Sequence, residues 1–319
     1  MEGFAFRGSG SSMRTCAVQC KLNDSQVRGN LPFVMHTTIV SSDEVSAHLD
    51  DPAWAIVDCR YDLHNETWGE DQYRAAHIPG AVYASLGHDL SGPKDGRSGR
   101  HPLPGHDAMS TTFGLWGIGS DVQVVAYDQD SGMFASRLWW MLRYMSHDAV
   151  AVLDGGFKRW TAEGRPTRDG IEHRLAAIFP GKPRPAMRLT ANQVWARLGD
   201  PTLTLVDARG PARFEGKEEP IDRVAGHIPG AMNHFFQLNL GPDGRLLPRE
   251  ELRHTFHRLL GEIPPEQVAV YCGSGVSACH NLLAMEHAGF SGAKLYPGSW
   301  SEWSADADKP VETGPSQRR

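Results

Sequence analysis

The chain has 319 residues, of which 40% are hydrophobic and 22% charged, and its formal net charge is −6. This length gives room for two ordinary domains, each with its own core. The net negative charge gives no reason to expect a nucleic-acid partner, and no run of about 18 apolar residues indicates a membrane-spanning helix. The five cysteines are odd in number and irregularly spaced, which excludes a disulfide framework and indicates a reducing, cytoplasmic setting.

Residues 1–36 are predicted to form a disordered tail. They contain Gly and Ser but little apolar periodicity, and they lack the continuous apolar core of a secretory signal. A start codon upstream of the true start, with Met35 directly before the first domain, and a transit peptide are alternatives. Cys16 and Cys20 form one short pair of the kind that zinc uses, but no clear second pair follows, so no metal site is expected.

The rest of the chain is a repeat. Residues 44–60 align without gaps with residues 193–209, and the motif HIPGA occurs at His77–Ala81 and again at His227–Ala231. The stretch VVAYD, which ends at Asp128, matches VAVYC, which ends at Cys272. A period of about 145 residues indicates that a whole domain has been duplicated in tandem. The predicted parts are a first domain, a linker, a second domain and a C-terminal tail, at residues 37–165, 166–188, 189–312 and 313–319.

Strand-like and helix-like segments alternate in each copy. Short apolar runs typical of buried parallel strands occupy residues 55–57, 122–127, 203–206 and 268–271. Residues 281–287 predict a helix that Gly289 ends, and residues 294–296 return to a strand. The alternation predicts an α/β fold with two tandem domains, each a mainly parallel sheet flanked by helices.

Two polar stretches are predicted to lie at the surface. Prolines and mixed charge in residues 164–188 indicate an extended linker over the surface. Residues 92–105 form a Gly/Pro-rich loop, interpreted as a plain surface loop, with a cover over the cleft between the domains as the alternative.

The stretch YCGSGVSACH contains the strongest candidate for a nucleophile, Cys272, which replaces Asp128 of the first copy. A strand, a tight Gly273-Ser274-Gly275 turn and a helix N-terminus would gather backbone N–H groups around one point and favour a thiolate. The alternative is a small buried hydrophobe.

The residues around this cysteine limit its chemistry. Phosphate chemistry needs an Arg six positions after the cysteine, where the chain has Ala278. His280 is predicted to be solvated on the helix behind the loop, which leaves acyl chemistry without its base. Sulfur chemistry needs only a thiolate and a ring of N–H donors.

The segment CGSGVSACHNLLAMEHAGF, the doubled HIPGA and Asp128 at the first copy's cysteine position resemble the tandem-domain rhodanese sulfurtransferases, over about residues 37–311. The resemblance implies two rhodanese-like domains and a persulfide formed on Cys272. The Cys-Gly-Ser-Gly-Val loop is similar to the 3-mercaptopyruvate sulfurtransferase branch, since thiosulfate-using relatives carry basic residues after the cysteine.

The resemblance therefore implies transfer of sulfur from 3-mercaptopyruvate to a thiol, thioredoxin or cyanide. Thiosulfate is the alternative donor, and a non-catalytic binding module is the less favoured reading. No cofactor, metal, nucleic acid or membrane is expected as a partner, and the chain is expected to be a monomer.

The family's proton relay maps onto Ser274 and His77, with Asp71, Glu70 or Glu66 as the acid. For His77 the alternative is a role in the turn of HIPGA, and for His227 this structural role is preferred.

The family's carboxylate-binding Arg-Phe pair maps onto Arg213-Phe214, with a salt bridge to Glu215 or Glu218 as the alternative reading of Arg213. A second family Arg follows Glu-Pro directly, whereas this chain has Ile221 there and Arg223 two places later. The resemblance also assigns donor contacts to four loop residues, which are Gly273, Gly275, Val276 and Ser277.

Other features are assigned to the framework. The pairs Asp58–Arg60 and Asp207–Arg209 are expected to shape turns after strands, and Cys279 to lie in the core. The tryptophans expected in the core or between the domains are Trp139, Trp140, Trp160, Trp300 and Trp303.

Overall fold

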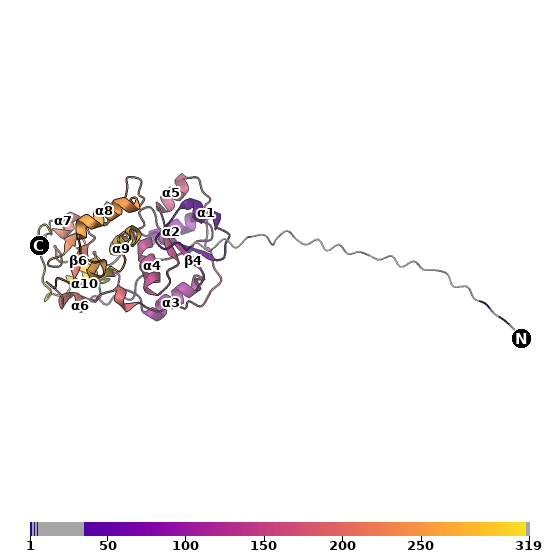
Figure 1. The fold of residues 1–319 in the computed structure, drawn as a ribbon, viewed down its shortest axis with the longest axis horizontal. Coiled ribbons are helices and arrows are strands. Elements are labelled where there is room, and N and C mark those ends of the chain that lie inside the picture. The colour runs from indigo at the N-terminus through magenta and orange to yellow at the C-terminus, as the bar shows by residue number, and fades with distance from the viewer. Residues whose placement is uncertain (2, 4, 6–34, 317–319) are drawn as a thin grey trace. The chain divides into compact units, whose positions relative to one another are not determined.

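Two parallel sheets carry the two copies in a computed structural model that describes residues 1, 3, 5 and 35–316 (Figure 1). The first sheet has the strand order β1-β5-β4-β2-β3 and the second the order β7-β6-β8-β9. All pairings between these strands are parallel. The strands are β1 (Ile39–Val40), β2 (Trp54–Asp58), β3 (Val82–Tyr83), β4 (Gln123–Tyr127), β5 (Val150–Leu153), β6 (Thr204–Asp207), β7 (Met232–Asn233), β8 (Val268–Tyr271) and β9 (Lys294–Leu295).

Helices connect the strands and flank the sheets, as parallel pairing requires. Those of the first copy are α1 (Ser42–Ala47), α2 (Trp68–Ala75), α3 (His106–Leu115), α4 (Ala135–Tyr144) and α5 (Gly156–Ala162). Those of the second are α6 (Ala191–Trp195), α7 (Pro211–Phe214), α8 (Arg249–Leu260), α9 (Ser277–Ala288) and α10 (Ser299–Trp303). Short 3₁₀ turns are η1 (Pro185–Met187), η2 (Phe236–Asn239) and η3 (Pro265–Gln267).

The central strands are buried on both faces. In β2, Ala55 and Val57 enter a core that both copies share, whereas Trp54 and Ile56 enter a core of the first copy alone. β8 alternates in the same way between the shared core and a core of the second copy. This burial explains why the strands have continuous apolar sequences.

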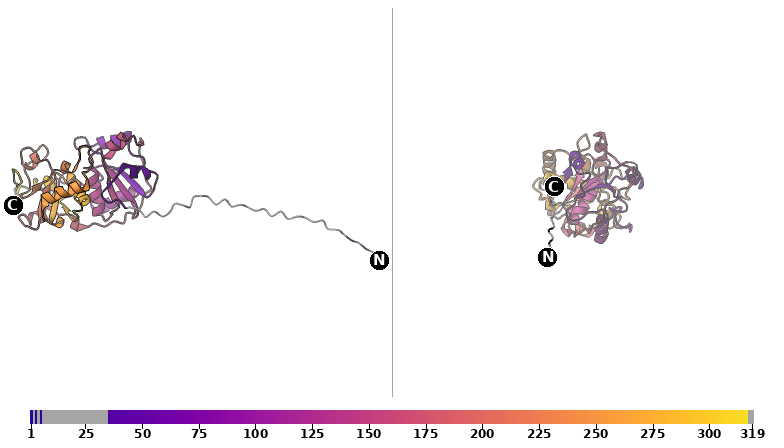
Figure 2. Two further views of the ribbon diagram at one scale, coloured as in Figure 1. Left: turned by 45° about the horizontal axis from the view of Figure 1, so that its top comes forward. Right: turned by 90° about the vertical axis from the view of Figure 1, so that its right-hand side faces the viewer.

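Helices α4 and α9 pack against each other and join the copies, which lie side by side in Figures 1 and 2. Leu138 and Met141 of α4 share one hydrophobic core with Leu282 and Leu283 of α9. The loop between β8 and α9 therefore lies at the boundary between the copies, within reach of side chains from the first.

The predicted fold class is confirmed, and β8 has its predicted bounds. α9 begins earlier than predicted, at Ser277, and ends at Ala288, where Gly289 caps it with a left-handed φ of 90°. The domain boundaries stay predictions. The tail with Cys16 and Cys20 lies outside the described residues.

The framework assignments are confirmed. The guanidinium of Arg60 donates to Asp58, and that of Arg209 donates to Asp207, each at 2.6 Å. All five tryptophans assigned to the core are buried. In the described part of the chain, no helix is long and apolar enough to cross a membrane.

Candidate active site

Cys272 lies at the carboxyl end of β8, is 2% exposed, and lines a cavity of 350 Å³. The N–H of Gly275 donates to its Sγ at 3.2 Å, and its own N–H donates to Ser299 Oγ at 3.1 Å. Ser299 has a φ of 56°, which is strained for a residue other than glycine, and its hydroxyl is anchored on the carbonyl of Tyr296. These contacts fix the sulfur at the wall of the cavity.

Gly273 and Gly275 lie in the loop after Cys272, and neighbouring groups of the protein fill the space where their side chains would be. Gly275 has a φ of 75°, and a Cβ there would lie 2.3 Å from the carbonyl oxygen of Pro297. A Cβ on Gly273 would lie 2.8 Å from the guanidinium of Arg100. Gly275 is therefore required by backbone geometry, and Gly273 makes room for a cation beside Cys272.

The loop after Asp128 in the first copy is equivalent to the loop after Cys272, and its N–H groups bind an anionic group. Asp128, at the position of Cys272, accepts N–H bonds from Gly132 at 2.9 Å and Phe134 at 2.8 Å. Burial raises the pKa of Asp128 to about 6, while these N–H bonds act in the opposite direction. The turn after the strand is thus a cradle for an anionic atom, filled by a carboxylate in one copy and by sulfur in the other.

Ser274 lies two residues after Cys272 and contacts a histidine of the first copy. Its Oγ is 2.8 Å from Nδ1 of His101. Burial lowers the pKa of His101 to about 3, and the charge of Arg137 acts in the same direction, so the ring is neutral at pH 7. His101 belongs to the loop at residues 92–105. The interpretation of that loop as a plain surface loop is therefore wrong, because its end enters the site.

The structure does not bring His77 to Ser274, and the predicted relay contact is wrong. His77 stacks on Tyr73 at 4.2 Å, and its Nδ1 donates to the carbonyl of Tyr73 at 2.7 Å. His227 stacks on Phe214 in the second copy and donates to its carbonyl, also at 2.7 Å. Because both copies form the same contacts, they belong to the HIPGA turn, as was preferred for His227.

The predicted acids do not pair with His77 either. Glu70 pairs with Arg74 and Glu66 with Lys94, and among the described residues no ion pair joins Asp71 to His77. The carboxylate beside Nε2 of His77 is that of Glu172, at 3.9 Å. Among the residues that the structure describes, no carboxylate is hydrogen-bonded to the ring of His101.

Two guanidinium groups, one from each copy, lie over Gly273. Its Cβ position is 2.8 Å from Arg100 and 3.6 Å from Arg213. Arg213 donates to Glu219 at 2.6 Å and to Asp222 at 3.1 Å, and Arg100 pairs with the same Asp222. The site therefore contains a cationic pair that a carboxylate of the chain itself bridges.

Arg213 lies where the resemblance put it, lining the cavity with Gly273, Val276 and Ser277. Its alternative partners are wrong, because neither Glu215 nor Glu218 pairs with it among the described residues. Arg223 is exposed and does not line the cavity. The second guanidinium beside Cys272 is Arg100.

The helix behind the loop is buried. His280 is fully buried rather than solvated, because α9 packs on the first copy, and its Nε2 donates to the carbonyl of Ser131 at 3.0 Å. Cys279 lies in the core, as predicted, and its Sγ donates to the carbonyl of Gly275 at 3.3 Å.

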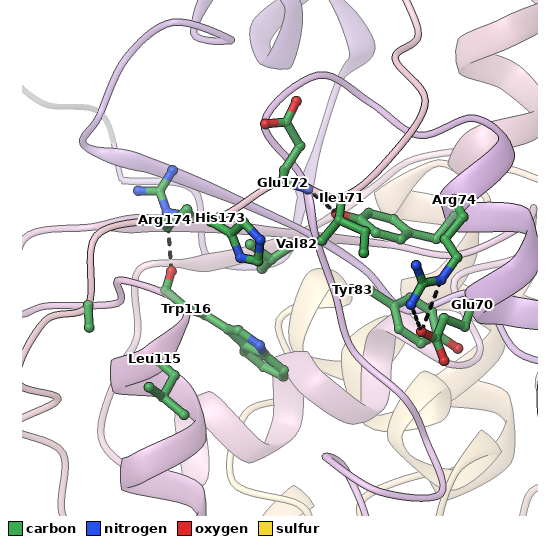
Figure 3. A pocket seen from close by; sticks show the side chains of 12 residues that line it. Glu70, Arg74, Val82, Tyr83, Leu115, Trp116, Ile171, Glu172, His173 and Arg174 are labelled. Carbon is green, nitrogen blue, oxygen red and sulfur yellow. Dashed lines mark hydrogen bonds and ion pairs between the residues drawn. The ribbon is translucent and has the colours of Figure 1, made fainter.

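A second cavity, of 460 Å³, lies on the first copy between α2, α3 and the linker (Figure 3). Glu70 and Arg74 pair with each other on its wall. The guanidinium of Arg174 donates to the carbonyls of Trp116, Trp54 and Pro52. Its lining has no thiol, and these charged groups are already bonded, so the chemistry belongs to the smaller cavity at Cys272.

Comparisons with known proteins agree with this geometry. The model of the Rhodanese-like domain family matches residues 41–163 and 190–306. The chain is 44% identical to a probable 3-mercaptopyruvate sulfurtransferase of Pseudomonas aeruginosa, over 278 residues that cover 86% of this chain and 98% of that protein. It is 39% identical to a putative thiosulfate sulfurtransferase of Mycobacterium tuberculosis, over 82% of this chain and 91% of that protein. The structure of 3-mercaptopyruvate sulfurtransferase from Leishmania major matches with a TM-score of 0.75 and 31% identity, over 84% of this chain and 74% of that one.

The chain contains two tandem copies of a parallel α/β domain, with a cysteine loop at the boundary between them. This arrangement defines a double-domain protein of the rhodanese type. The chain belongs to the rhodanese-like domain family. The predicted class of enzyme, a sulfurtransferase, is confirmed.

Proposed function

We propose that the enzyme moves the sulfur of 3-mercaptopyruvate to a thiol or cyanide acceptor through a persulfide on Cys272. The observation that carries this choice of donor is the contact of 2.8 Å between His101 and Ser274, which lines the cavity of Cys272. When mercaptopyruvate loses its sulfur, the leaving carbon must gain a proton. A hydroxyl held by a neutral imidazole can pass one on.

The first half-reaction balances without an external acid. The Cys272 thiolate attacks the donor sulfur, an S–S bond forms, and the C–S bond breaks with its electron pair on carbon. The proton of the donor's thiol passes through Ser274 to that carbon, which gives pyruvate and an ionised persulfide. In the second half-reaction the acceptor attacks the outer sulfur, and the Cys272 thiolate leaves.

Arg213 and Arg100 support a donor that carries a carboxylate. Their guanidinium groups both lie within 4 Å of the Cβ position of Gly273, next to Cys272. A planar guanidinium matches a carboxylate by its paired N–H donors. The donor's carboxylate would take the place that Asp222 holds between the two arginines.

Thiosulfate is the second candidate donor. Arg100, Arg209 and Arg213 line the same cavity, and three guanidinium groups suit a dianion. Thiosulfate releases sulfite, which needs no proton on the leaving atom. The two donors therefore differ in their need for Ser274.

Replacement of Ser274 by Ala tests the relay with both donors. We expect S274A to lower kcat with mercaptopyruvate by about 10²-fold, and to change kcat with thiosulfate much less. His101→Gln should show the same pattern. Ser291→Ala, which removes an exposed hydroxyl of the second copy outside the cavity, is the control and should leave both rates near wild type. Equal losses of kcat with the two donors in S274A would show that Ser274 stabilises the structure of the loop and does not transfer the proton.

The acceptor and the cellular setting belong to the same proposal. A low-molecular-weight thiol or thioredoxin would take the outer sulfur, and the enzyme would work as a monomer in the cytoplasm. The described cysteines Cys59, Cys272 and Cys279 are free thiols, which suits a reducing compartment. Persulfidated enzyme mixed with reduced thioredoxin should lose one sulfur by intact mass.

A further inference from the structure

Arg137 of α4 is a fully buried cation at the boundary between the copies. Its side chain is 0% exposed. Nη1 donates to the carbonyl of Gly275 at 2.9 Å, and Nη2 donates to the carbonyls of His101 at 3.0 Å and Leu90 at 3.3 Å. One side chain of the first copy thus holds the loop that carries Cys272 and the segment that carries the relay histidine.

This arginine differs from the other deeply buried arginines. Arg60 and Arg209 are both 3% exposed, and each forms a close ion pair with the aspartate two residues before it. No carboxylate among the described residues pairs with Arg137. Carbonyl groups satisfy its N–H donors but leave its charge uncompensated, and a buried charge without a counter-ion is costly.

Two sulfur atoms are hydrogen-bonded to the residue that Arg137 holds. The N–H of Gly275 donates to the Sγ of Cys272 at 3.2 Å, and the carbonyl of Gly275 accepts from Arg137 and also from the Sγ of Cys279, at 3.3 Å. Burial raises the pKa of Cys279 to about 12, so that residue stays a neutral thiol at physiological pH. Cys272 is therefore the sulfur of this loop that can provide a counter-charge for Arg137.

The duplicated fold contains an internal comparison. Asp128 and Cys272 are equivalent residues, each directly after a strand. Ser131 and Gly275 follow them by three residues and are therefore equivalent as well. The carbonyl of Gly275 accepts from Arg137, while that of Ser131 accepts from His280 of α9. Burial lowers the pKa of His280 to about 4, so its ring is neutral at pH 7. Each copy thus donates a hydrogen bond to the equivalent loop of the other copy. The donor to the cysteine loop is a permanent cation, whereas the donor to the loop of Asp128 is a neutral ring.

We propose that Arg137 is a positioning residue that supplies the counter-charge for the Cys272 thiolate and, after sulfur transfer, for the persulfide. Cys272 is anionic both when it attacks the donor and when it leaves to the acceptor, so one fixed cation serves both half-reactions. The inference rests on Cys272 as the nucleophile. The other charged or titratable groups near this loop come from both copies. They are Arg100, His101, Arg209, Arg213, Glu218, Glu219, Asp222, Cys279 and His280.

The test is the pH dependence of alkylation of Cys272 by iodoacetamide in the full chain, followed by peptide mass. It needs no sulfur donor, so its outcome is independent of the proposed choice of donor. In Arg137→Gln we expect the alkylation rate at pH 7 to fall about tenfold and the rate profile to move to higher pH, because a full charge is lost from a buried site. Arg137→Lys keeps the charge and should recover most of the rate.

His280→Gln is the matched control, because it alters the equivalent contact on the other loop and should leave the alkylation profile unchanged. A profile of R137Q that coincides with those of wild type and H280Q would overturn the proposal.

A second measurement leaves Arg137 in place. Cys272→Ser removes the sulfur that the proposal makes the counter-charge of this buried cation, so we expect C272S to unfold at a lower denaturant concentration than wild type. An unfolding midpoint of C272S equal to or above that of wild type would overturn the proposal even if R137Q does not fold.

Discussion

Asp222 occupies the space between the two arginines that are proposed to bind the donor. Its carboxylate contacts both Arg100 and Arg213. Burial raises the pKa of Asp222, and the charge of Arg100 acts in the opposite direction. Asp222 therefore offsets part of the positive charge of the two arginines. A donor has to replace a carboxylate that is itself costly to keep ionised in this place.

Arg213→Ala should weaken the use of mercaptopyruvate. The loss of a charged hydrogen-bond partner corresponds to about 1.5–3 kcal/mol, so we expect KM to rise by about 10- to 100-fold with a smaller change in kcat. Arg223→Ala is the control, because Arg223 is exposed and lies outside the cavity. Steady-state kinetics of both variants measure this. An unchanged KM in R213A would show that the donor's carboxylate binds elsewhere.

At the residue scale, the sequence predicted the groups that belong to recognisable motifs of the second copy. Cys272, Ser274 and Arg213 line one cavity. His101 was missed because it contacts Ser274 across 173 residues of sequence. A signal was present: the stretch RHPLPG of the first copy aligns with GRLLPR of the second, so this histidine, like Cys272, occurs in one copy alone.

The loop between β8 and α9 depends on backbone shape more than on side chains. We expect Gly275→Ala to destabilise the fold by about 1–3 kcal/mol and to abolish activity, because its Cβ would overlap the carbonyl of Pro297 at 2.3 Å and its φ is 75°. Gly244→Ala is the control: it shares a left-handed φ, of 77°, but has open space around it. It should cost about 1 kcal/mol and keep activity. Chemical denaturation and turnover, measured together, separate strain from the effect on the site.

At the element scale, long apolar strands were predictable because both of their faces are buried. The start of α9 was not, since Val276 precedes its first residue and provides no side-chain cap. Strands of two residues, such as β3 and β7, carry no recognisable pattern, and they form because a longer neighbour pairs with them.

At the scale of the molecule, the boundary between the copies buries histidines that must stay neutral. The pKa of His280 is lowered to about 4, against about 6.5 for an unfolded chain, so the unfolded state binds more protons below pH 6.5. Stability therefore falls as the pH falls.

We expect His280 alone to remove about 2 kcal/mol of unfolding free energy between pH 7 and pH 5. His280→Gln should flatten this slope in denaturant titrations, while His257→Gln, on the exposed side of α8, should leave it unchanged. A slope in H280Q as steep as that of wild type would show that other groups carry the acid sensitivity.

The packing of α4 against α9 also has a consequence for the history of such a chain. After a duplication, two copies can diverge freely only while each remains self-sufficient. Here the second copy holds the nucleophile, while the first holds Arg100, His101 and Arg137. Loss or exchange of either half alone should therefore separate these groups from Cys272 and remove the activity.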